Sequence, residues 1–485
     1  MRKQYEPQIE LGATPIEQIV IKEDKRDELP GILRGLQWIY CTHEVFNPIM
    51  ELLEKKIQSD KIKTGRWGMN LWQVFVLGVL RNGMNADFSR LTDFANNHRL
   101  IREMMGLVGF VKNPNFHYQT ICDNVNLIDD DTLKQINHII AEHGGKLFKK
   151  KDELGLEIRT DGYVLETNVH FPTDINLLWD SARKCLDMIE KLNELESIEG
   201  WRKHADWRRE LKSLKMRLER AQHGGGKNKE KRVAVAVEAY LKKSYNLEEK
   251  MFETLQQLNS SVKENASIGL FFSLQDYHEL LIHHIILVHK RLVDGDVIEH
   301  KDKYFSIFEQ HTQWLQKGKS GKPVELGHNI LISVDQYRLI RDYEILHSKG
   351  EKEGILSVVS RLTEKCSEPI LSISTDKGFH SAQNIELLEE YIPLVAIPKP
   401  GKRNLQETEK ENRKEFVNAI KNHSGVESVI NSLEHHGMNR CRNKGLEGYK
   451  RCVGFGVLSY NLHQIGNQLL ALETEAEERR SRKVA

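Results

Sequence analysis

The segment Ile370-Leu371-Ser372-Ile373-Ser374-Thr375-Asp376-Lys377-Gly378 has the pattern of a buried strand that ends in a carboxylate and a glycine. Aliphatic and β-branched residues dominate its first six positions, which predicts a strand over 370–375. Asp376 and Gly378 then favour a turn of the backbone. Because functional groups gather at strand ends in open α/β sheets, Asp376 is the first candidate site residue.

The sequence around this segment alternates between strand and helix patterns. Strands are expected at 330–334 and 394–397, and helices at 356–363 and 385–391. Strands separated by helices indicate an α/β fold.

A second carboxylate, Asp161, is expected at the end of an upstream strand. Apolar and polar residues alternate over 156–160, and 163–169 has a second strand pattern. Asp161-Gly162 between these segments predicts a tight turn, so the two are expected to form a β-hairpin.

A third carboxylate, Glu427, lies in a predicted helix. Three converging carboxylates can hold two divalent cations, and hard oxygen ligands suit Mg²⁺ or Mn²⁺. Two such metals roughly 4 Å apart activate the attacking oxygen and stabilise the leaving oxygen in phosphoryl transfer. Spacing alone does not decide between Glu427 and Glu434, because residues seven apart lie on nearly the same face of a helix. Further acidic candidates are Asp174, Asp180 and Asp335.

Two long regions have helical patterns. Residues 175–322 resemble a helical hairpin or a short coiled-coil arm, with a flexible joint at Gly224-Gly225-Gly226. This block splits the α/β pattern in two. Residues 66–150 contain two short helical patterns about the turn at 82–85, which fits a helix-turn-helix and equally fits an ordinary helical bundle.

The net charge is close to zero, but the charge is unevenly distributed. The 485 residues contain 71 Lys or Arg and 70 Asp or Glu, and this average gives no nucleic-acid signature. Between Trp201 and Arg232, however, twelve Lys or Arg accompany four Asp or Glu. This segment is either a DNA-binding stripe or a solvated helix face. Its candidate phosphate contacts are Arg208, Arg209 and Lys212.

Two tryptophans accompany the basic segment. Trp201 and Trp207 either pack within the helical block or stack on a splayed base, and packing is favoured because helical aromatic residues are usually buried.

The six cysteines are scattered and form no CxxC pair, which is typical of a reducing compartment. The N-terminal residues are polar, and no apolar run approaches the roughly 20 residues that a membrane span needs. A cytoplasmic protein without membrane segments is therefore expected.

A zinc site is the other metal hypothesis. Its candidate ligands are His435, His436, Cys441, Cys452 and His463. The ten-residue gap between the two cysteines fits no usual paired spacing, which disfavours structural zinc.

Three blocks occur in order along the chain. The first is Arg159-Thr160-Asp161 with 166–174, and the second is Lys322-Pro323-Val324-Glu325 followed by Ser374-Thr375-Asp376-Lys377-Gly378-Phe379-His380-Ser381. The third is Ser424-Gly425-Val426-Glu427 and the residues up to Glu434, with 436–441 and Asn461-Leu462. Together, over about residues 66–466, they resemble bacterial insertion-sequence DDE transposases of the ISNCY-type group. The second block is similar to that family's D-K-G-Y motif, with Phe in place of Tyr.

The resemblance implies an RNase H-like catalytic fold that cleaves and joins DNA at the ends of an insertion sequence. It assigns Asp161, Asp376 and Glu427 as the catalytic and metal-binding triad, choosing Glu427 over Glu434, with Mg²⁺ (or Mn²⁺) as cofactor. The expected partners are terminal inverted repeats and target DNA. A homodimer or larger synaptic assembly is expected because two ends must be joined, and the location is then bacterial and nucleoid-associated.

Basic residues near the second Asp are expected to contact DNA. Lys377 and His380 follow Asp376 directly, and a basic loop with Lys399, Lys402 and Arg403 follows the last predicted strand. Both groups are positioned for phosphate contacts, and solvated surface residues are the alternative for both.

The resulting hypothesis is an α/β, RNase H-like catalytic domain that is interrupted by a large helical insertion and preceded by a helical N-terminal DNA-binding domain. The expected layout is an N-terminal extension at 1–65, the DNA-binding domain at 66–150, the catalytic domain at 151–174 and 323–466, the helical insertion with its basic arm at 175–322, and a charged tail at 467–485. Two alternatives remain: a metal-dependent nuclease without strand transfer, and an inactive DNA-binding regulator.

Overall fold

The computed structural model describes residues 12–22, 27–58, 68–107, 115–149, 154–196, 198–261, 265–316, 323–347 and 350–484. Lys322, the first residue of the second transposase-like block, lies outside these ranges. Residues 1–11 of the expected N-terminal extension also lie outside them. The fold is α/β, as predicted, and the described residues form 16 α-helices and a mixed seven-stranded sheet. In the described part of the chain, no helix has both the length and the apolar character needed to cross a membrane.

Two compact units make up the chain. One comprises Met1–Asn168 and Gln313–Ala485, and the other is Val169–Thr312. The sheet belongs entirely to the first unit. Its strands are β1 (Leu156–Thr167), β2 (Gln313–Gln316), β3 (Val324–Val334), β4 (Ile340–Leu346), β5 (Ile370–Thr375), β6 (Leu394–Ala396) and β7 (Arg440–Cys441).

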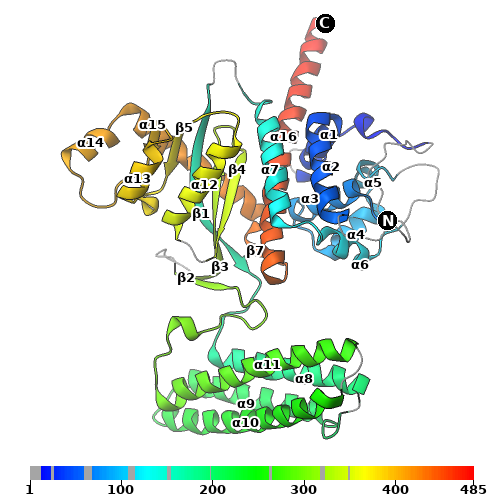
Figure 1. Ribbon diagram of the computed structural model, residues 1–485, viewed down its shortest axis with the longest axis vertical. Coiled ribbons are helices and arrows are strands. Elements are labelled where there is room, and N and C mark those ends of the chain that lie inside the picture. Colours follow the sequence, from blue (N-terminus) through cyan, green and yellow to red (C-terminus); the bar gives the residue numbers. More distant parts are fainter. Residues whose placement is uncertain are drawn as a thin grey trace. The chain divides into compact units, whose positions relative to one another are not determined.

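Strand β1 lies at the centre of the sheet order β2-β3-β1-β5-β6 (Figure 1). It pairs antiparallel with β3 on one side and parallel with β5 on the other, and β5 continues in parallel to β6. Strand β4 adds an antiparallel partner to β3, and the short β7 pairs with the end of β1. The sheet therefore combines an antiparallel half with a parallel half.

The predicted hairpin at 154–172 is wrong. Asp161 and Gly162 lie in the middle of β1, where they pair with Ile332 and Leu331 of β3. Asp-Gly favours a turn locally, but here β3 pairs with β1 without a break from Arg159 to Glu166. Pairing with β3 thus overrides the local preference, and Asp161 is not at the end of its strand.

Helices cover both faces of the sheet (Figure 1). On one face, α12 (Glu351–Lys365) and α13 (Ala382–Glu389) bury apolar side chains against Leu156 and Ile158 of β1. On the other face, α15 (Lys414–Leu433) packs on Tyr163 of β1. Successive side chains of a strand point to opposite faces, so the odd-numbered residues of β1 face α15.

The remaining helices of this unit form a second core. They are α1 (Glu28–Cys41), α2 (His43–Gln58), α3 (Leu71–Gly83), α4 (Phe88–Asn97), α5 (Arg99–Met104), α6 (Tyr118–Val125), α7 (Asp130–Gly145) and the long α16 (Gly445–Val484). The helix α14 (Leu405–Glu411) lies apart, after β6. Short helical turns occur at Ile16–Gln18, Lys377–Phe379 and Glu434–Met438.

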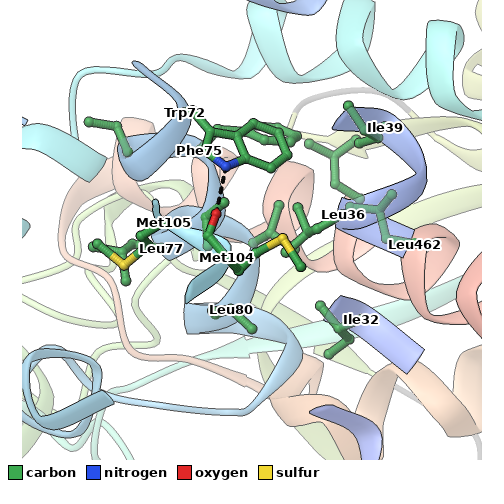
Figure 2. Close-up of a cluster of buried hydrophobic side chains, with 14 of the residues drawn as sticks. Ile32, Leu36, Ile39, Trp72, Phe75, Leu77, Leu80, Met104, Met105 and Leu462 are labelled. Carbon is green, nitrogen blue, oxygen red and sulfur yellow. Dashed lines mark hydrogen bonds between the residues drawn. The ribbon is translucent and has the colours of Figure 1, made fainter. Parts of the chain in front are cut away.

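Helix α3 is central to this second core. Nearly all of its side chains are buried, and Trp72 donates its indole N–H to the carbonyl of Met104 at 2.7 Å (Figure 2). Leu36 of α1 and Leu462 of α16 belong to the same cluster (Figure 2). Helices α1 and α2, which the sequence assigned to a separate extension, therefore share one core with α3 and with the far end of the chain.

The second unit is helical. Its main helices are α8 (Asp174–Glu196), α9 (His204–His223), α10 (Lys229–Ser261) and α11 (Asn265–His289), with short turns at Lys290–Asp294 and His300–Asp302. They lie side by side in Figure 1 around one apolar core. The break between α9 and α10 at Gly224-Gly225-Gly226 was predicted from the sequence.

The tryptophans of this unit are packed. Trp201 is almost fully buried, and its indole N–H donates to Thr254 Oγ1 at 2.8 Å. Trp207 is half-buried, with Lys243 Nζ 3.7 Å from its ring centroid. The packing hypothesis for Trp201 is confirmed.

The backbones of helices α1 and α16 are in direct contact. We therefore expect a side chain added at this contact to destabilise the protein. A Cβ atom at Gly466 would lie 1.8 Å from the carbonyl oxygen of Gly31, and one at Gly35 would lie 2.2 Å from that of Leu462. Gly466→Ala must push the helices apart, so we expect a loss of about 3 kcal/mol or more, measured by calorimetric unfolding.

Gly269 of α11 is the matched control, because a Cβ there would meet nothing within 4 Å. Gly269→Ala is expected to be neutral or to stabilise the helical unit by up to about 1 kcal/mol. Equal melting temperatures for Gly466→Ala and the wild type would contradict this account of the α1–α16 contact.

Candidate active site

The register of two parallel strands brings Asp161 and Asp376 together. Thr160 of β1 pairs with Thr375 of β5, so the next residue on each strand is one of the two aspartates. Asp161 is half-buried within β1, whereas Asp376 is exposed just beyond the end of β5. Because side chains alternate along a strand, both aspartates point to the face that α15 covers.

Glu427 approaches the same place from α15. The neighbouring Val426 and Val429 are buried against Tyr163, which fixes this helix on the sheet, while Glu427 stays exposed. Its negative charge acts on Asp161, as does that of Asp376. The structure therefore brings together the three acids that the sequence singled out.

The environment raises the pKa of Asp161 to about 6. Burial is the main cause, and the carboxylates of Asp376, Glu351 and Glu427 add to it by repulsion. The backbone N–H of Gly162, which donates to Asp161 Oδ1 at 2.7 Å, acts in the opposite direction. The site thus concentrates negative charge around Asp161.

Glu351 is a fourth acid at this site that the sequence did not indicate. Its Oε1 accepts a hydrogen bond from Asn329 Nδ2 at 2.6 Å. A Cβ at Gly162 would lie 3.1 Å from Oε1, and one at Gly378 would lie 3.4 Å from Oε2, so both glycines leave room for this carboxylate. An acid in the first turn of a helix is common for electrostatic reasons, and no local pattern distinguished this one.

His423 is a second residue that the sequence missed. It lies one helical turn before Glu427, is buried, and places Nε2 3.5 Å from Asp376 Oδ1. Burial lowers the pKa of His423 although Asp376 and Glu427 attract a proton, and the nearby Arg159 further disfavours a positive ring.

The donor set fits divalent cations. In the described part of the chain, no Lys or Arg forms an ion pair with Asp161, Asp376 or Glu427. Carboxylate oxygens without a basic partner are the ligands that Mg²⁺ and Mn²⁺ prefer. Among the described residues, the ligand oxygens of the triad do not all lie within 4.8 Å of one another.

A tighter cluster of metal-ligand types lies elsewhere in the first unit. Among the described residues, His138, Glu142 and Cys366 are the one group of three whose ligand atoms all lie within 4.8 Å. Glu142 is already engaged by Arg341, at 3.4 Å, and by Ser367. This carboxylate thus serves a buried network around Arg341 rather than an open site.

The residues of the zinc hypothesis are divided between separate contacts. The thiols of Cys441 and Cys452 hydrogen-bond to each other, and all six cysteines of the chain are free thiols. His436 contacts the Gly83 carbonyl, and the rings of His436 and His463 meet edge to face. Within the described ranges, these residues do not form a group that could hold one ion.

The basic residues expected near Asp376 differ in their surroundings. Lys377 is exposed directly after Asp376, and His380 is half-exposed close to it. In the loop after β6, Lys399 and Arg403 are paired with Glu407 and Glu411 of α14, each at 2.6 Å. Lys402 in the same loop is exposed. Phosphate contacts by Lys399 or Arg403 would have to compete with these ion pairs.

The three basic residues predicted to bind DNA in the helical unit also differ in whether an acidic side chain already pairs with them. Arg208 bridges Asp187 and Glu190 of α8, and Arg209 pairs with Asp206 at 2.9 Å. Lys212 is exposed on α9.

A more concentrated positive surface lies between α9 and α10 of the same unit. A hollow of about 460 Å³ there is lined by four cationic residues, together with small apolar ones. The cationic residues are Arg217, Arg220, Lys231 and Arg232. All four are among the twelve basic residues counted in the sequence, but only the packing of the two helices shows that they converge.

Comparison with known proteins found no matching family model, no matching curated protein and no solved structure that matches this chain. The site is therefore interpreted from its own geometry.

The raised pKa of Asp161 predicts a pH-dependent loss of stability without metal. Because the pKa is higher in the folded state than the usual 3.8, folding is increasingly disfavoured as the pH rises from about 4 through 6. In EDTA, Asp161→Asn should stabilise the protein by about 2 kcal/mol at pH 7 and have little effect at pH 4. Thermal unfolding at several pH values measures this.

The amide oxygen of the substituted side chain would still accept the hydrogen bond of Gly162, so Asp161→Asn removes the charge but keeps the local geometry. Glu434→Gln, at an exposed carboxylate just after α15, is the matched control and should leave the pH profile unchanged. A gain of stability that is the same at pH 4 and pH 7 would contradict the electrostatic explanation.

Proposed function

We propose that the protein is a DDE transposase that cleaves and joins DNA at the ends of an insertion sequence by two-metal phosphoryl transfer. One observation carries the proposal: Asp161 and Asp376 each directly follow a residue of the last β1–β5 pair, Thr160 and Thr375, and Glu427 of α15, which packs on that face, acts electrostatically on Asp161. These are the three acids that the resemblance assigns as the catalytic triad.

The proposed fold of this unit is RNase H-like. Three features support it: a central strand that carries the first acid, an antiparallel half formed by β3 and β4, and parallel strands β5 and β6 that each follow a helix. The helical unit at Val169–Thr312 is inserted in the sequence between β1 and the next strands of this sheet.

Each acidic residue has a defined task in this proposal. Asp161, Asp376 and Glu427 would hold two Mg²⁺ or Mn²⁺ ions, which supply activation of the attacking oxygen and stabilisation of the leaving oxygen. Water is the first nucleophile and frees a 3′-hydroxyl, and that hydroxyl then attacks target DNA. In this proposal Lys377, which is exposed beside Asp376, contacts a phosphate next to the scissile bond.

Other parts of the chain would bind DNA away from the chemistry. In this proposal the N-terminal helices recognise the terminal inverted repeats, and the basic surface of the helical unit binds DNA backbone. Two element ends must be joined, so the active species is a homodimer or a larger synaptic assembly.

Substitution of the triad tests the proposed activity. Asp161→Asn and Asp376→Asn should each abolish Mg²⁺- or Mn²⁺-dependent cleavage and strand transfer on a duplex that contains an element end, because both remove a ligand charge. Glu427→Gln should do the same, whereas Glu434→Gln should retain activity. Gel analysis of cleaved and joined products measures both steps.

The products also distinguish the alternatives. Cleaved ends without joined products from the wild type would indicate a nuclease, and DNA binding without any metal-dependent nicking would indicate a regulator. Strand transfer retained by both Asp→Asn variants would refute the proposed site.

The cationic hollow between α9 and α10 tests the proposed DNA-binding role of the helical unit. Each cation that neutralises a phosphate adds roughly 0.9 to the slope of log affinity against log salt concentration. Arg220→Ala combined with Lys231→Ala should therefore weaken binding to any DNA sequence and reduce this slope by about 2, as measured by fluorescence anisotropy.

The matched control removes two cations that are already paired within the fold. Lys215 pairs with Glu219 at 3.0 Å, and Lys243 pairs with Glu210. The double variant Lys215→Ala, Lys243→Ala should leave the salt slope nearly unchanged. Equal slopes for both double variants would show that the hollow is not where DNA binds.

A further inference from the structure

The imidazole of His423 is buried beside Asp376, and its Nε2 atom has no hydrogen-bond partner within the described part of the chain. Its side chain is 8% exposed, and Nε2 lies 3.5 Å from Asp376 Oδ1. A buried polar atom without a partner is costly, so this position calls for an explanation.

The other ring nitrogen is held by the strand that carries Asp376. Nδ1 lies 3.4 Å from the hydroxyl of Ser374, two residues before Asp376 on the same face of β5. In the tautomer that carries its proton on Nδ1, Nε2 presents a lone pair toward Asp376 Oδ1. Two acceptors face each other stably only when a proton or a cation lies between them.

The geometry suits a shared cation. When two ligand atoms each lie about 2.1 Å from one cation and the ligand–cation–ligand angle is about 90–110°, the two ligand atoms are roughly 3.0–3.5 Å apart. The observed separation of Nε2 and Asp376 Oδ1 is 3.5 Å. His423 and Glu427 are four residues apart on α15, so they project from the same side of the helix.

We propose that His423 is a further ligand of the cation that Asp376 binds, which makes the site a mixed nitrogen and oxygen site. This inference rests on the proposed function, because it assumes that Asp376 binds a divalent cation. Ser374 acts as the positioning residue, since its contact with Nδ1 turns Nε2 toward Asp376.

A nitrogen ligand changes which ion the site prefers. Mg²⁺ prefers oxygen ligands and keeps much of its water, whereas imidazole is a good ligand for first-row transition metals. The site should therefore bind Mn²⁺ more tightly than Mg²⁺, and His423 should contribute more to the Mn²⁺ affinity than to the Mg²⁺ affinity.

Pulsed electron paramagnetic resonance of the full-length protein loaded with Mn²⁺ tests the ligand directly. The wild type should show coupling of the Mn²⁺ electron spin to a directly bound nitrogen. His423→Asn should lose this coupling, because its shorter side chain keeps a donor near Ser374 but does not reach Asp376. We also expect at least roughly tenfold weaker Mn²⁺ binding, and a smaller change for Mg²⁺.

Two further variants separate the possible outcomes. Ser424→Ala changes the exposed neighbour of His423 on α15 and should keep both the nitrogen coupling and the affinity. Asp376→Asn should weaken Mn²⁺ binding whether or not His423 is a ligand. Thermal unfolding in EDTA checks that His423→Asn is folded, and His423→Gln provides a second variant with a longer side chain.

Each result has a defined meaning. Mn²⁺ binding that depends on Asp376 but shows no nitrogen coupling, or that is unchanged in His423→Asn, would overturn the role of His423 and leave the proposed function intact. Mn²⁺ binding that is unaffected by Asp376→Asn would instead refute the metal site on which the proposed function depends. A merely structural His423 would alter the unfolding temperature without any nitrogen coupling in the wild type.

Discussion

The pairing of β1 with two different partners is the constraint on which the rest of the structure depends. Antiparallel pairing with β3 fixes the position of β1 along the sheet, and parallel pairing with β5 places Thr160 opposite Thr375. A shift of one residue in either register would turn Asp161 toward α12 instead of α15. The same ladders that stabilise the core therefore also determine whether the acids meet.

Much of the α/β pattern could be predicted from the sequence because it is local. The strand at Ile370–Thr375 and the helices that follow it have short-range apolar patterns, and the structure confirms them. The sequence wrongly predicted a turn at Asp161-Gly162. No local pattern could show that these residues continue a strand, because the β3 residues that pair with them lie more than 160 positions away in the chain. Glu351 and His423 were missed for the same reason, because only tertiary packing brings them to Asp161 and Asp376.

The near-zero net charge likewise conceals a strongly patterned surface. Basic residues that look alike in the sequence fall into two classes in the structure. Arg208 is neutralised by acids of the neighbouring helix, whereas Arg220 and Lys231 converge on a hollow with other cations. The count of charges showed that the segment from Trp201 to Arg232 is unusually basic. It could not show which of these cations are free to contact a ligand, because that depends on how α9 and α10 pack.

The backbone contact between α1 and α16 has a consequence for synthesis of the chain. Helices α1 and α3 emerge from the ribosome early, but α16, which fills their core with Leu462 and Ile465, begins only at Gly445. Until that helix has been made, the nascent chain must expose an apolar surface that stays covered in the finished protein. Chaperone demand should therefore persist through most of translation, and premature termination before α16 should yield aggregation-prone chains in which the core around α1 and α3 is incomplete.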